Sequence, residues 1–176
     1  MVSGAGPIGL LCVQAALAAG ATTVIVTDIA DKRLEKAKAI GATHIINAKE
    51  EDIPQKIKSI TELGVDVFLD CAGVQASYTT GIDSLKNGGT AVLVALFGKP
   101  VTTDALDQVL REITIKGIIA YRNIFPQVIA LIDSGRMPVE KLVTRKISLD
   151  NIVSEGFEAL VNDPTEVKIL IDIQKN

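Results

Sequence analysis

A glycine pattern at the start of the chain, Gly4-Ala5-Gly6-Pro7-Ile8-Gly9, constrains the fold most, together with Asp28, which follows 19 residues after Gly9. Such a pattern between a strand and an apolar helix is typical of dinucleotide sites. Gly4 permits the tight turn, Gly6 lets the backbone approach a pyrophosphate, and Gly9 lets the helix pack closely on its strand. The diphosphate would then meet free N–H groups and the positive end of the helix dipole. The alternative is a purely structural glycine turn.

The residues around this pattern favour dinucleotide binding. Pro7 suits a first helical turn and Gly20 suits the residue after a helix end. Asp28 closes a Val/Ile-rich strand, where its carboxylate would accept hydrogen bonds from the ribose hydroxyls of NAD and repel the 2′-phosphate of NADP. The alternative is an aspartate that caps the following turn. Lys32 and Arg33 could welcome a phosphate or be solvated residues of the next helix, and we favour NAD.

Strand and helix signals alternate along most of the chain, which predicts parallel βαβ units. The fold class is therefore α/β, a doubly wound, parallel, six-stranded Rossmann sheet of order 3-2-1-4-5-6. The predicted strands end at residue 3 and span 22–28, 44–47, 65–71, 90–96 and 113–120. The predicted helices span 7–19, 31–40 (capped by Asp31), 52–63, 76–85, 104–111 and 125–134. After residue 135 the rhythm changes to a strand at 142–147, a helix at 149–161 and a strand at 167–173. We therefore divide the chain into a cofactor-binding domain, 1–135, and an appended segment, 136–176.

Bulk properties exclude several classes of function. The net charge of −3 and the 3% aromatic content argue against a nucleic-acid surface. No run approaches the roughly 18 apolar residues of a membrane span, and no secretory leader is visible. Cys12 and Cys71 are expected to be reduced core residues, which fits a cytoplasmic protein.

The sequence offers no catalytic residues and no metal site. His44 is the single histidine, and the two cysteines are far apart in sequence, so no local cluster has zinc-ligand spacing. We expect His44 to be structural. The residues four positions after Tyr78 and Tyr121 are not lysines, so the tyrosine–lysine pair of short-chain dehydrogenases is absent.

The chain resembles the zinc-dependent medium-chain alcohol and polyol dehydrogenases over nearly its whole length, and most of all the 2,3-butanediol (acetoin-reducing) dehydrogenases. The resemblance is carried by residues 4–9, 64–76, 88–92, 99–100, 155–160 and 167–171, with Asp-Cys-Ala-Gly-Val-Gln at 70–75 the most distinctive run. This family joins an N-terminal catalytic domain to a cofactor domain and then returns to the catalytic domain. The resemblance thus accounts for the short first strand and for the discordant segment 136–176, and it implies that a catalytic domain belongs upstream of Met1.

The resemblance also extends the cofactor site. Arg33 is similar to a residue that flanks the adenosine, and Lys168 to a basic residue that reaches the pyrophosphate, although a surface lysine is an equal alternative. Three segments at strand ends are implied to line the cofactor: Cys71-Ala72-Gly73, Ala95-Leu96-Phe97 and Ile119-Ala120-Tyr121. Gly73 could instead serve a simple turn, and Phe97 and Tyr121 could be edge packing. Sorbitol-type relatives carry an arginine where Ala120 stands, so the sequence favours a small diol over a long polyol.

The family further implies a zinc whose ligands lie outside this chain, so that the chain alone is expected to bind NAD and turn nothing over. It also implies a dimer through the edge of the sixth strand. Two rival functions stay open: a regulatory nucleotide-sensing module without chemistry, and a zinc-free, NADPH-dependent quinone reductase. Residues 142–173 argue against the first and Asp28 against the second.

Overall fold

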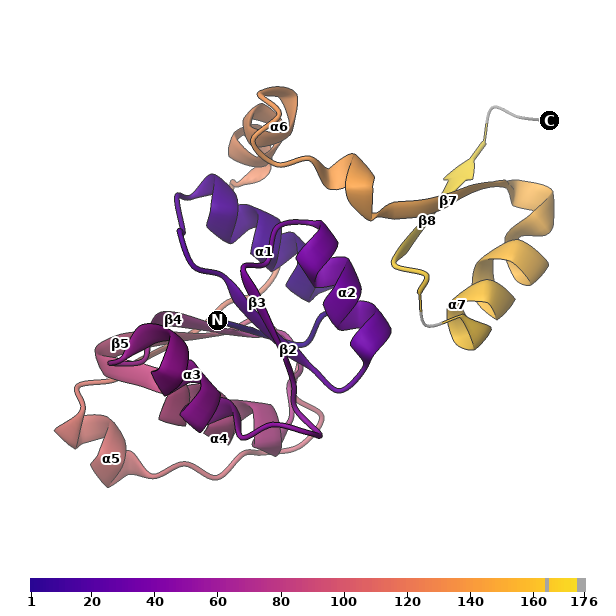
Figure 1. Cartoon of the computed structure of the whole chain (residues 1–176). Coiled ribbons are helices and arrows are strands. Elements are labelled where there is room, and N and C mark those ends of the chain that lie inside the picture. The colour runs from indigo at the N-terminus through magenta and orange to yellow at the C-terminus, as the bar shows by residue number, and fades with distance from the viewer. Residues whose placement is uncertain (164, 174–176) are drawn as a thin grey trace.

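The computed structural model describes residues 1–163 and 165–173 and contains a six-stranded parallel sheet with helices on both faces (Figure 1). The strand order is β3-β2-β1-β4-β5-β6, which confirms the predicted doubly wound topology. The strands of this sheet are β1 (Val2–Ser3), β2 (Ile25–Asp28), β3 (His44–Asn47), β4 (Val65–Asp70), β5 (Leu85–Leu93) and β6 (Thr114–Gly117). The helices are α1 (Pro7–Ala18), α2 (Asp31–Ala39), α3 (Ile53–Thr61), α4 (Gln75–Ser84), α5 (Ala105–Leu110) and α6 (Phe125–Asp133).

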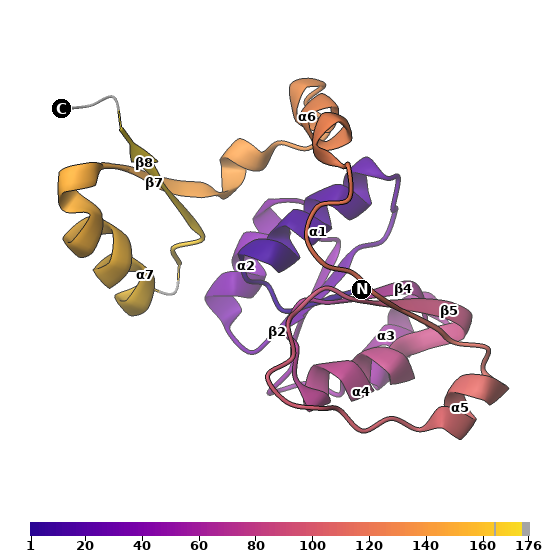
Figure 2. The same ribbon diagram turned by 180° about the vertical axis from the view of Figure 1, so that it is seen from behind.

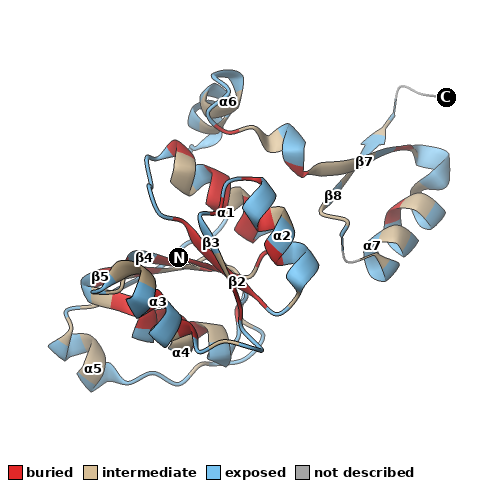
Figure 3. Ribbon diagram, in the orientation of Figure 1, coloured by how far each residue is buried: buried red, intermediate tan, exposed pale blue. Residues whose placement is uncertain are grey.

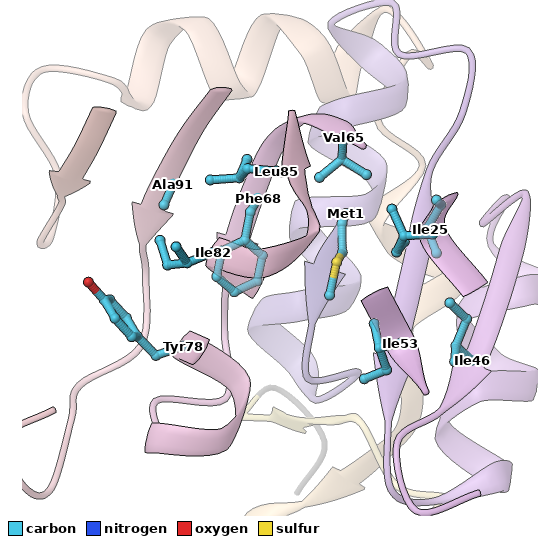
Figure 4. Close-up of a cluster of buried hydrophobic side chains, with 11 residues drawn as sticks. Met1, Ile25, Ile46, Ile53, Val65, Phe68, Tyr78, Ile82, Leu85 and Ala91 are labelled. Atoms are coloured by element: carbon cyan, nitrogen blue, oxygen red, sulfur yellow. The ribbon is translucent and has the colours of Figure 1, made fainter. Parts of the chain in front are cut away.

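Two apolar layers hold the sheet between its helices. One face packs on α1 and α2 through buried Leu10, Val13 and Leu34. The other packs on α3 and α4, with Phe68 fully buried at its centre (Figure 4). Figure 2, from behind, shows the same two layers, and Figure 3 shows that burial is concentrated along the sheet and on the helices α1 to α4 that pack against it, whereas α5 and α6 are largely exposed.

The C-terminal segment forms a small separate sheet of two parallel strands, β7 (Val143–Ser148) and β8 (Lys168–Asp172). One apolar and one polar contact attach this segment to the α1–α2 layer. Leu142 is buried in that layer. Gln14 on α1 donates a hydrogen bond from Nε2 to the Pro138 carbonyl at 2.9 Å. The segment therefore packs against α1 before it extends away. Residues 174–176, the end of the predicted appended segment, lie outside the described residues.

Several predicted elements need correction. The helix expected over 149–161 is a 3-10 turn (Leu149–Asn151), a wide π turn (Ile152–Phe157) and the short helix α7 (Glu158–Asn162). Gly156 lies in the π turn, where an added Cβ would come within 3.2 Å of the Ile147 side chain on β7, so this turn packs closely on β7. The predicted strands 22–28 and 113–120 are shorter than expected. Asp31 does not cap α2; its side chain accepts a hydrogen bond from Asn47 Nδ2 at 2.6 Å.

Met1 lies beside β4, where its backbone nitrogen donates a hydrogen bond to the Val67 carbonyl at 2.8 Å. Its side chain is buried in the layer that contains α3 and α4.

Candidate functional site

In the turn between β1 and α1, one glycine has room for a side chain and two do not. Gly4 has φ +88°, and a Cβ there would lie 3.1 Å from the backbone of Cys71 and Ala72. A Cβ on Gly9 would lie 1.8 Å from the Gly4 carbonyl oxygen. A Cβ on Gly6 would meet no atom within 4 Å. Gly4 and Gly9 are thus required for the turn itself, whereas Gly6 leaves free space in front of the helix.

The amino end of α1 faces this space with free donors. Gly6 precedes the helix and supplies no capping side chain, and Pro7 begins the helix without an N–H. The first intrahelical bond runs from Leu10 N–H to the Gly6 carbonyl at 2.9 Å. The N–H groups of the first turn have no acceptor within the helix, so the turn suits a negatively charged group. Exposed Ile8 lies at the same end.

Asp28 lies beside this turn at the carboxyl end of β2. Its Oδ2 accepts a hydrogen bond from Ala5 N–H at 2.7 Å, and its Oδ1 accepts one from Ala30 N–H at 3.0 Å. The side chain is 8% exposed. Each carboxylate oxygen retains a lone pair, because an ionised carboxylate has about four acceptor positions. The acid therefore supports the glycine turn and keeps the capacity to bind a hydroxyl group.

The second wall of the crevice follows β4 and β5. Cys71 and Ala72 lie against Gly4, and a Cβ on Gly73 would come within 2.8 Å of Ala95 Cβ and 3.1 Å of the Leu96 carbonyl oxygen. Gly73 has φ +69°, a conformation that favours glycine. The structure thus brings together Gly4, residues 71–73 and residues 95–96 at the carboxyl ends of β1, β4 and β5, where open α/β sheets bind their ligands.

Sequence reasoning missed Asp70, which holds this wall in place. The side chain is fully buried, and its Oδ1 accepts hydrogen bonds from the N–H groups of Ala72 and Gly73, both at 3.0 Å. Ser77 on α4 donates its hydroxyl to the same carboxyl group at 3.1 Å. In an Asx turn, an aspartate side chain accepts a hydrogen bond from a backbone N–H two or three residues later. Asp70 precedes Gly73 by three residues, so this pattern could have identified it.

Arg33 borders a cavity of about 600 Å³ between α2 and the start of the small sheet. Ala5 of the glycine turn lines the same cavity, as do Lys32 on α2 and Val167 just before β8. Lys168, the next residue, is exposed and begins β8. The structure therefore brings the predicted segment around Lys168 close to α2, but the lysine itself is not part of the cavity lining.

The remaining predicted residues lie at the β5 and β6 edge. The Phe97 ring packs edge-on against Tyr78, with centroids 6.5 Å apart, and Tyr121 is 73% exposed and contacts Phe125 at 5.1 Å. Phe97 thus packs against the core, whereas the Tyr121 ring is mostly exposed. Ile119 is exposed, and Ala120 has φ +50°, an uncommon value for a residue with a side chain.

Two further features lie away from the crevice. A cavity of about 630 Å³ opens at the amino ends of β1, β2 and β4, lined by Met1, Thr23 and Val65 among others. It is at the opposite end of the sheet from the glycine turn. His44 begins β3 and contacts the Thr43 hydroxyl through Nδ1 at 3.0 Å.

Within residues 1–163 and 165–173, no three His, Cys, Asp or Glu side chains are grouped to hold a metal ion. No helix in these residues has the length and apolar character to cross a bilayer.

The crevice, the parallel sheet and the glycine turn define a Rossmann-type α/β domain. Residues 7–134 match the family model described as zinc-binding dehydrogenase, and the chain belongs to this family. It is 40% identical over 170 residues to the (R,R)-butanediol dehydrogenase of Bacillus subtilis. The aligned region covers 97% of this chain and 49% of that protein. The chain therefore spans about half the length of the curated relatives it matches.

Solved structures agree with this assignment. The crystal structure of 2R,3R-butanediol dehydrogenase from Bacillus subtilis superposes with a TM-score of 0.93 at 39% identity, covering 98% of this chain and 50% of that one. Two more distant neighbours were solved with a nicotinamide cofactor. An Escherichia coli alcohol dehydrogenase with NADH has a TM-score of 0.89 at 26% identity, covering 98% of this chain and 51% of that one. A Sinorhizobium meliloti protein with NADP has a TM-score of 0.86 at 28% identity, with the same two coverages. Relatives of this fold thus bind both forms of the cofactor.

Proposed function

We propose that this chain is the NAD(H)-binding part of a dehydrogenase that acts on a secondary alcohol or vicinal diol of the 2,3-butanediol/acetoin type. The observation that carries the proposal is the 2.7 Å hydrogen bond between Ala5 N–H and the Asp28 carboxylate. It joins the glycine turn to the acid 23 residues away, so a pyrophosphate site and a ribose site are adjacent. Cytoplasmic location and the division at residue 135 are parts of the same proposal.

The chain's own residues fit the cofactor. The space beside Gly6, which a Cβ would fill, suits a pyrophosphate, and the amino end of α1 supplies donors. Asp28 would accept the ribose hydroxyl groups. Arg33 would flank the adenosine, since it borders the cavity that also contains Ala5. Gly73, Ala95 and Leu96 would form the wall at the nicotinamide end.

When bound, NAD would supply the hydride acceptor or donor for the alcohol–ketone interconversion. The role of this chain is to bind and orient that cofactor. We propose that the catalytic zinc is held by residues outside this chain, and that this chain alone catalyses no turnover.

The test of cofactor choice is calorimetric titration with NADH and NADPH. We expect NADH to bind at least about tenfold more tightly, because the Asp28 carboxylate is repelled by a 2′-phosphate. The Asp28→Asn variant loses the charge, so its preference for NADH should shrink. Only its amide oxygen accepts, so it keeps one of the two backbone hydrogen bonds, and thermal unfolding measures the accompanying loss of stability. Equal affinity of the unaltered chain for the two cofactors would contradict the assignment and would favour the NADPH-dependent reductase.

We also propose a homodimer through the β6 edge. Apolar side chains are exposed along this edge and the adjacent helix α5: Leu106, Val109, Leu110, Ile115, Ile118 and Ile119. Such edges are usually paired or covered. Light scattering should give the mass of a dimer, and Ile115→Lys should yield a monomer, whereas Leu63→Lys, an equally apolar but distant exposed site, should not. A dilute monomer in the unaltered chain would contradict the proposal.

A further inference from the structure

The two cysteines of the chain, 59 residues apart in sequence, are in contact. Cys71 donates a hydrogen bond from its thiol to Cys12, with the sulfur atoms 3.6 Å apart. Cys12 belongs to α1, and Cys71 is the first residue after β4. Neither thiol has a role in the function proposed above, which uses only the backbone around Cys71.

The pair lies directly behind the glycine turn. Cys71 donates its backbone N–H to the Ser3 carbonyl at 2.8 Å, which fixes it beside β1. An added Cβ on Gly9 would lie 3.6 Å from the Cys71 Cβ. Cys12 follows Gly9 by three residues and so lies on the same side of α1, about one helical turn further on. A bond between the sulfurs would therefore join the first turns of α1 to the end of β4.

The two thiols differ in reactivity. The hydrogen bond from Cys71 lowers the pKa of the Cys12 thiol, although burial opposes this shift. The same hydrogen bond and burial raise the pKa of Cys71. Both side chains are only half-buried, so a small oxidant has access to them. Because the thiolate is the reactive form, Cys12 is the nucleophile of the pair.

We propose that Cys12 and Cys71 form a peroxide-sensitive dithiol that closes to an intramolecular disulfide and is reopened by a dithiol reductant. The Cys12 thiolate attacks one oxygen of hydrogen peroxide, the O–O bond breaks, and hydroxide leaves, giving a sulfenic acid. The Cys71 sulfur then attacks the Cys12 sulfur, the S–O bond breaks, and water leaves. In total the two thiols lose two electrons and two protons, and one peroxide becomes two waters.

Closure should change the cofactor crevice. A disulfide holds its sulfurs about 2.05 Å apart, so the two must approach by roughly 1.5 Å. This movement draws the first turns of α1 toward β4 beneath the glycine turn and narrows the space beside Gly6. This step rests on the proposed NAD site: the oxidised chain should bind NADH at least about tenfold more weakly than the reduced chain.

The experiment treats the whole chain with hydrogen peroxide and counts free thiols, with intact mass as a second readout. We expect both thiols to be lost together, the mass to fall by two hydrogens, and dithiothreitol to restore both thiols and the NADH affinity. Cys12→Ser and Cys71→Ser serve as matched controls. Neither variant should form the internal disulfide. Cys12→Ser should keep its NADH affinity after peroxide treatment, and Cys71→Ser should accumulate a sulfenic acid that dimedone traps.

Two results would overturn the inference: retention of both thiols at peroxide doses that fully oxidise free glutathione, or disulfides that only link separate chains on a non-reducing gel. An internal disulfide with unchanged NADH affinity would refute the effect on the crevice. If the reduced chain fails to bind NADH at all, the proposed cofactor function fails, whereas the thiol count still decides the cysteine pair.

Discussion

Gly6→Val should lower NADH affinity by roughly 100-fold while leaving the stability of the fold nearly unchanged. Gly6 has φ −73° and ψ −176°, an extended conformation that valine adopts readily, and its added Cβ would meet no atom within 4 Å. The protein therefore tolerates the side chain. The same side chain would fill the free space at the amino end of α1, where we place the pyrophosphate. Calorimetry gives the affinity, and thermal unfolding gives the stability.

Variants of two other glycines serve as controls for this prediction. Gly117→Val on β6 also adds a side chain into the open space of one chain. It lies on the edge proposed for the dimer, so it serves as a control for NADH affinity alone, which it should not change. Gly9→Val would drive a Cβ into the Gly4 carbonyl oxygen, so it should destabilise the fold, and a loss of binding there would say little about the ligand. Unchanged NADH affinity in Gly6→Val would show that the glycine turn does not bind the diphosphate.

The topology of the sheet was predictable because its signals are local. The glycine turn, Asp28 at a strand end and the repeated change between strand and helix patterns each depend on a few neighbouring residues, and together they define a doubly wound sheet. The ends of the elements were less predictable. The strand expected to run to Ala120 ends at Gly117, and Ala120 and Asn123 have positive φ, a turn that the apolar sequence does not reveal.

The candidate site was also predictable only in part. The sequence alone indicated Gly4, Gly6, Gly9 and Asp28, because their spacing is tied to a specific chemistry. It could not show that Cys12 contacts Cys71, or that Arg33 and Val167 border one cavity, because these contacts join segments that are distant in sequence. The close packing of Gly156 on β7 was also unpredictable, since it joins two segments that the local sequence pattern does not relate.

Asp70→Ala should destabilise the chain by about 3–5 kcal/mol, since the N–H groups of Ala72 and Gly73 would lose their acceptor. The cost is large because the carboxyl group is fully buried, so water does not replace it without opening the core. The turn at 71–73 would also lose its fixed position. We therefore expect weaker NADH binding even in the fraction that stays folded, measured by urea unfolding and by titration at low temperature.

Asp70→Asn is the conservative control, because its amide oxygen can still accept the backbone N–H groups and it should cost only about 1 kcal/mol. Asp66→Ala is the matched control on the same strand. Its side chain is 80% exposed and forms an ion pair with Lys86 at the surface, so its loss should cost less than about 1 kcal/mol and leave NADH binding unchanged. Equal losses of stability in Asp70→Ala and Asp66→Ala would show that the buried carboxyl does not organise the turn. A stable Asp70→Ala chain with full NADH affinity would show that the wall at Gly73 is held by its packing against Ala95 instead.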